Sequence, residues 1–145
     1  MSVPNEPPSS RPSADPAAEI SRLRLIWSSF FGAIAALVLV TYLAEMPAGP
    51  PPEIMPMALG FVALGLASLA LFWAPRQLTH YPLLVMVRCA LAEAIALNGF
   101  VLRFLGARPS LFYAFIGLAV IVLLLVAPSA DERARLHREP RQGPD

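Results

Sequence analysis

Residues Leu83 to Leu105 read LLVMVRCALAEAIALNGFVLRFL, a 23-residue apolar run that contains three charged side chains. A helix needs about 17–25 mainly apolar residues to cross a bilayer, so this run predicts a membrane span. Glu93 lies near its middle and is the only acidic residue in any apolar run of the chain. Because a carboxylate is costly in lipid, we expect Glu93 to be partnered, protonated or used in function.

Three more runs have the length and composition of spans: residues 25–43, 54–73 and 111–127. Proline and glycine separate the runs, which indicates distinct helices rather than one long rod. Of the 145 residues, 57% are hydrophobic and only 14% are charged, which is far from the average of soluble domains. We therefore predict an all-α polytopic membrane protein with four transmembrane helices, the third covering residues 83–105.

We place the transmembrane domain at residues 22–128, with a polar segment on each side of it. Residues 1–21 are rich in Pro, Ser and Ala, a composition typical of a disordered tail. Residues 129–145 are polar, and we predict a solvated tail there, with an amphipathic surface turn as the alternative. With four spans, both tails lie on the same side of the membrane.

Arginine supplies all eleven basic residues and indicates which side that is. Cytoplasmic segments close to the spans carry the excess of basic residues. The side of the termini holds most of the arginines, among them Arg22, Arg24 and Arg76, whereas Arg103 and Arg108 lie towards the other side. We predict cytoplasmic termini and, from the abundance of Ala, Arg and Pro without Lys, the inner membrane of a bacterium.

The surroundings of Glu93 define the candidate site. Arg88 precedes it by five residues and lies about 140° around the helix, so an ion pair within the helix is not expected. Arg88 is close enough to the end of the run for its side chain to extend to the headgroups. Glu93 then needs a partner on another helix, which includes Arg88 of a neighbouring copy, or a neutral form.

Two more residues support this site. Asn98 is expected to form a hydrogen bond between helices, worth about 1 kcal/mol. Gly99, like Gly60 and Gly65 in the preceding run, is expected to let helices approach closely.

The stretch Ala90 to Leu102, with Glu93 followed by Gly99, resembles the ion-carrying helix of the proteolipid (c) subunits of rotary ATP synthases. The resemblance covers residues 57–105 and includes Arg76 and Gln77, which match the short polar loop of that family's helical hairpin. It implies that Glu93 is the proton or sodium site of an oligomeric ring. The first and fourth runs have no counterpart in that hairpin, and the whole chain also resembles small bacterial multi-pass membrane proteins.

Signatures of other classes are missing from the sequence. There is no catalytic triad pattern, phosphate-binding glycine loop, HExxH or CxxC motif, so we predict no enzyme activity, no metal site and no cofactor. No basic patch with aromatic residues indicates nucleic-acid binding.

Two hypotheses remain, and both place the protein in the lipid bilayer as a homo-oligomer or part of a larger membrane complex. In the first, the protein is a structural or partner-binding helical bundle in which Glu93 fixes helix packing. In the second, it is a proteolipid-like proton or sodium carrier that acts through Glu93.

Overall fold

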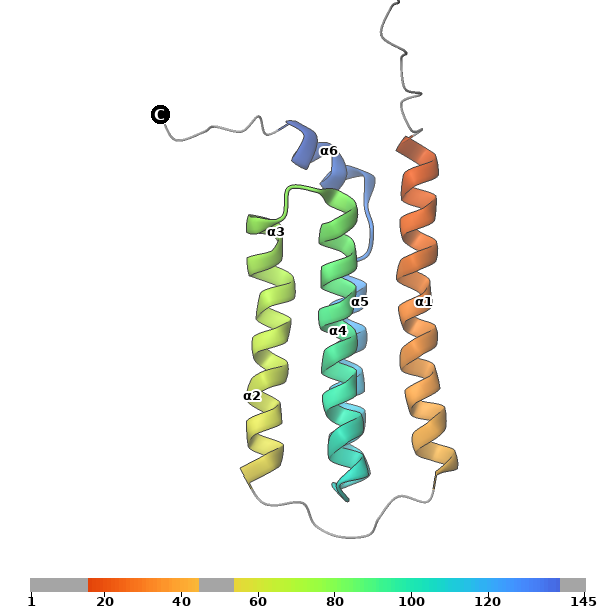
Figure 1. Ribbon diagram of the computed structural model, residues 1–145, viewed down its shortest axis with the longest axis vertical. Helices are drawn as coiled ribbons and strands as arrows, with labels where there is room; N and C mark the ends of the chain where they lie inside the picture. The colour runs from red at the N-terminus through yellow and green to blue at the C-terminus, as the bar shows by residue number, and fades with distance from the viewer. Residues whose placement is uncertain (1–15, 45–53, 139–145) are drawn as a thin grey trace, which may run out of the picture.

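The structure is a computed structural model that describes residues 16–44 and 54–138. All regular elements within those ranges are helices. They are α1 (Pro16–Leu43), α2 (Ile54–Ser68), the π-helical turn η1 (Leu69–Trp73), α3 (Ala74–Gln77), α4 (Tyr81–Phe104), α5 (Pro109–Leu125) and α6 (Ala130–Arg138). Because α2, η1 and α3 follow one another without a break, they form a single long rod (Figure 1).

Four long rods lie side by side and alternate in direction, with α4 between the others (Figure 1). Helix α4 contacts α1, α2 and α5. The short helix α6 lies across one end of the bundle, together with the start of α1, helix α3 and the start of α4 (Figure 1). We call this the α6 end. The first and last described residues therefore lie at the same end of the bundle.

Among the described residues, three helices are long and apolar enough to cross a membrane: Ala17–Leu43, Ile54–Gln77 and Tyr81–Phe104. The fourth apolar helix, α5, has 17 residues and is therefore about 26 Å long, slightly less than the about 30 Å of a bilayer core. The predicted all-helical class is thus confirmed for the described residues. Three of the four predicted spans are helices of spanning length, and α5 is shorter.

Part of each predicted tail is helical. Residues 16–20, which we assigned to a disordered tail, already belong to α1, and residues 1–15 lie outside the described part. Pro16 at the first helical position and Glu19 in the first turn both favour a helix start. Residues 130–138, within the predicted polar tail, form α6, and Ser129 and Glu132 have the spacing of a capping box at its start.

The connection between α4 and α5 shows why the chain turns where it does. Gly106 has a φ of 91°, a left-handed conformation that glycine adopts without a Cβ clash. Its N–H donates to the Arg103 carbonyl and the Ala107 N–H donates to the Leu102 carbonyl, both at 3.0 Å. These two hydrogen bonds form a Schellman motif, and Pro109 then begins α5.

Small residues set the distances between helices, although not all those that we predicted. Gly99 allows the close approach of α4 and α5, because a Cβ built there would lie 2.6 Å from Cβ of Phe115. A Cβ built at Gly60 or Gly65 meets nothing within 4 Å, so those two glycines bring no helices together within one chain. Their predicted role belongs instead to a buried stripe of alanines on the α2–α3 rod, Ala63, Ala67, Ala70 and Ala74.

The Gly99→Ala substitution should destabilise the fold by about 1–2 kcal/mol, because the added methyl group forces α5 away from α4. Thermal unfolding in mild detergent measures this effect. Gly65→Ala is the matched control: it makes the same change in helix propensity at a position with open space. Equal melting temperatures for the two variants would contradict the close packing at Gly99.

Candidate functional site

Arg88 is the one buried charged residue in the described part of the chain, with only 7% of its surface exposed. Its Nε donates to the carbonyl oxygen of Ala70 at 3.0 Å, and its Nη1 donates to Oε1 of Glu132 at 2.7 Å. The Arg88 side chain thus extends towards the α6 end, as expected, but it does so through bonds to protein groups. It joins α4 to the η1 turn and to α6.

The Ala70 carbonyl is free to accept this bond because of Pro75. In the π-helical turn the Ala74 N–H donates to the Leu69 carbonyl, one residue further back than in an α-helix. The next N–H along the chain would serve Ala70, but Pro75 has none. The guanidinium of Arg88 satisfies the carbonyl that the proline leaves without a partner.

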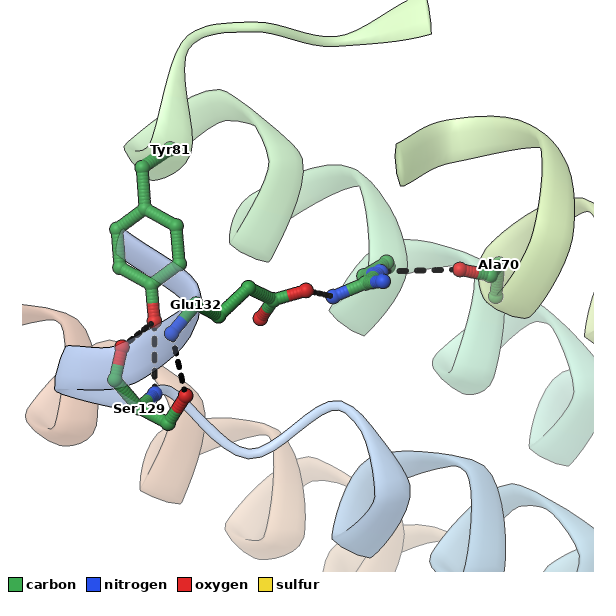
Figure 2. A network of polar contacts seen from close by, with 5 residues as sticks. Ala70, Tyr81, Ser129 and Glu132 are labelled. Carbon is green, nitrogen blue, oxygen red and sulfur yellow. Dashed lines mark hydrogen bonds and ion pairs between the residues drawn. The ribbon is translucent and has the colours of Figure 1, made fainter. Parts of the chain in front are cut away.

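Glu132 is free to pair with Arg88 because Tyr81 takes over part of the helix cap. Ser129 Oγ accepts the Glu132 N–H at 3.2 Å, which is one half of a capping box. In the usual other half, the glutamate side chain would accept the N–H of the serine. Here the Tyr81 hydroxyl accepts that N–H at 2.7 Å and donates to the Ser129 carbonyl at 2.9 Å (Figure 2).

Helix α1 joins the same end of the bundle through two contacts. Arg133 of α6 forms an ion pair with Glu19 of α1. Lower in the bundle, the Trp27 indole N–H donates to the Leu123 carbonyl at 2.9 Å. That carbonyl lies in the last turn of α5, where helix carbonyls lack partners, and the Ala127 N–H donates to the Leu124 carbonyl instead.

Glu93, the residue on which the sequence analysis centred, lies near the midpoint of α4 and is half-buried. In the part of the chain that the structure describes, Glu93 makes no hydrogen bond and no ion pair. Its neighbours on the outward side of the helix are exposed: Met86, Ala90, Leu97 and Phe104. We call these five residues the Glu93 stripe.

The other polar residues of α4, Arg88, Asn98 and Arg103, lie in different environments. Arg88 and Glu93 are not brought together, since Arg88 pairs with Glu132. The Nδ2 atom of Asn98 is buried and has no hydrogen-bond partner among the described residues, so its expected bond to another helix is not formed by this atom. Arg103 donates to the Ala107 carbonyl at 3.0 Å.

Glu132, Tyr81 and the Ala70 carbonyl were not among the predicted site residues. The signals were present: the spacing of Ser129 and Glu132 for a cap, and Pro75 near the end of an otherwise helical run. Within residues 16–44 and 54–138, no group of three or more His, Cys, Asp or Glu side chains could hold a metal ion.

Comparison of the chain with models of known protein families, with curated proteins and with solved structures finds no match. The resemblance of residues 57–105 to proteolipid subunits therefore stays a prediction.

Removing the Glu132 carboxylate should release α6 from the bundle. We expect Glu132→Ala to lower stability by about 1–3 kcal/mol, because a buried guanidinium loses its charged partner. Thermal unfolding in detergent and the rate of tryptic cleavage after Arg133 and Arg135 measure the loss. Asp131→Ala is the control, since Asp131 is exposed and forms no ion pair in the described chain. Unchanged cleavage in Glu132→Ala would contradict the role of this pair.

Proposed function

We propose that the protein is an integral membrane protein with four spans and that it binds a partner inside the bilayer through the Glu93 stripe. The insertion is supported by three helices of spanning length and by a fourth apolar helix antiparallel to its neighbour α4. The short helix α5 fits a bilayer that thins locally, which costs only fractions of a kcal/mol per ångström. The inner membrane of a bacterium is the proposed location.

The proposed orientation places the α6 end in the cytoplasm. Arg22, Arg24, Arg76 and Arg135 are exposed near that end, whereas Arg108 is the exposed arginine at the opposite end of the described bundle. This distribution follows the excess of arginine on the cytoplasmic side of membrane proteins.

A reporter fused after Asp145 tests this orientation. We expect a fluorescent reporter that matures only in the cytoplasm to be active, and alkaline phosphatase, which matures only in the periplasm, to be inactive. Fusion of each reporter within the connection between α4 and α5 is the control and should give the opposite result. A periplasmic C-terminus would contradict the proposed topology.

One observation carries the proposed partner binding. Of the three charged residues in α4, Arg88 and Arg103 have hydrogen-bond partners, but Glu93 has none in the described chain. A polar group at the depth of the lipid tails gains from a partner there, since water is scarce. The apolar members of the Glu93 stripe supply surface on which a helix of another chain can pack, and Ala90 leaves room for it.

The same observation also supports a second candidate, a carrier that acts as an oligomer. A carboxyl without a fixed partner on the outside of a bundle is free to exchange an ion, whereas a carboxylate held in an ion pair is not. The α4 residues next to Glu93 on the helix surface, Cys89, Ala90, Ala96 and Leu97, carry no side-chain oxygen. Sodium ions bind through several oxygen ligands, so this carrier would move protons.

Substitutions of Glu93 separate the two functions. If Glu93 binds a partner, Glu93→Ala should weaken the association about fivefold or more, while Glu93→Gln keeps most of it, because an amide also forms hydrogen bonds between helices. If Glu93 carries protons, both variants should abolish proton flux into proteoliposomes, and Glu93→Gln should still assemble. Cross-linking in native membranes measures association, and an internal pH dye measures flux.

Leu97→Ala is the control, since it shortens another member of the Glu93 stripe without touching the carboxyl. Labelling of membranes with a hydrophobic carbodiimide provides an independent readout, since this reagent attacks a neutral carboxyl that lipid can reach. A chain that is monomeric in membranes, binds no other protein and moves no protons would contradict both functions.

A further inference from the structure

A polar cleft of about 370 Å³ lies at the α6 end. No residue of the Glu93 stripe lines it. Its polar members are Arg88, Ser129, Asp131, Glu132 and Arg135, and its apolar members are Leu125 and Ala127. The partner-binding function proposed above leaves this cleft unexplained.

Arg88 offers the cleft a donor that the protein itself does not use. Its Nε and Nη1 are bonded to Ala70 and Glu132, but no hydrogen bond in the described chain uses Nη2. In the described chain, the fully buried side-chain nitrogen and oxygen atoms without a hydrogen-bond partner are Asn98 Nδ2 and Arg133 Nε. Nη2 of Arg88 is not one of them, so it is not fully buried. Since Arg88 is otherwise buried and lines the cleft, Nη2 is open to the cleft.

The other charges of the cleft are also available. Asp131 and Arg135 are exposed, and neither forms an ion pair within residues 16–44 and 54–138. The cleft therefore has two guanidinium groups and two carboxylates, of which one pair, Arg88 and Glu132, is already joined. Equal numbers of positive and negative groups do not favour a ligand that carries only negative charge. They favour a ligand that carries one negative and one positive group.

The position of the cleft indicates what such a ligand is. Leu125 is the last residue of α5, and Ala127 follows it, so the cleft lies where an apolar helix gives way to polar chain. In a membrane this is the level of the lipid headgroups. Its volume is at the lower end of the about 300–1,000 Å³ typical of ligand sites, which suits a headgroup rather than a whole lipid.

We propose that this cleft binds the headgroup of an aminophospholipid of the phosphatidylethanolamine type. The phosphate accepts hydrogen bonds from Arg88 Nη2 and Arg135, and the ammonium group donates to Asp131. The inference rests on the proposed membrane insertion but not on any role of Glu93.

Native mass spectrometry of the full chain in detergent, with defined lipids added, tests this site. The wild type should bind phosphatidylethanolamine about tenfold more tightly than phosphatidylcholine, whose trimethylated nitrogen has no N–H to donate. It should also prefer phosphatidylethanolamine to the anionic phosphatidylglycerol. Asp131→Asn and Arg135→Gln should each remove most of this preference. Arg76→Gln is the control, since Arg76 is an exposed arginine near the same end that does not line the cleft.

The outcomes separate this inference from the proposed function. Equal binding of the three lipids, tightest binding of phosphatidylglycerol, or an equal loss in Arg76→Gln would overturn the headgroup site while leaving membrane insertion intact. A chain that does not fractionate with membranes would instead overturn the proposed function. Circular dichroism of each variant shows whether the helices are retained, and Arg135→Gln changes only an exposed side chain.

Discussion

A guanidinium group inside an apolar bundle is stable only if its hydrogen-bond donors and its charge are satisfied, and Arg88 meets this constraint with groups from two other elements. The Ala70 carbonyl fixes the position of the α2–α3 rod against α4. The Glu132 carboxylate fixes α6 against the end of the bundle. Glu132 in turn depends on the cap that Ser129 and Tyr81 form. One buried cation therefore determines how three separate parts of the chain meet.

Two backbone carbonyls of this bundle lack a backbone donor because the helical hydrogen-bond pattern changes next to them. Pro75 has no N–H for the Ala70 carbonyl, and the Ala127 N–H, which would serve the Leu123 carbonyl in a regular helix, donates to the Leu124 carbonyl. In each case a side chain of another helix, Arg88 or Trp27, donates instead. A change in the helical hydrogen-bond pattern thus creates a specific acceptor for a neighbouring helix. This explains how a bundle of mostly apolar helices obtains directional contacts.

The sequence predicted the helical class and the position of the apolar helices because hydrophobic runs and proline breaks are local signals. It did not predict the partner of Arg88, because Glu132 lies 44 residues away and nothing in the run around Arg88 identifies it. The sequence identified Glu93 as a lone carboxylate, but only the assembled helices show that no other described residue pairs with it. The predicted roles of Gly60 and Gly65 failed for a related reason: glycine composition does not reveal which face of a helix meets a neighbour.

The separation of Arg88 and Glu132 along the chain also constrains biosynthesis. Arg88 is made 44 residues before Glu132, so the cation of α4 has no carboxylate partner until α6 has been synthesised. Until then, its other bonding group in the structure, the Ala70 carbonyl, is already present, because it precedes Arg88 in the chain. The contact between α4 and α6 is therefore completed last. A chain that stops after α5 would contain every apolar helix and still lack the counter-ion of its buried charge.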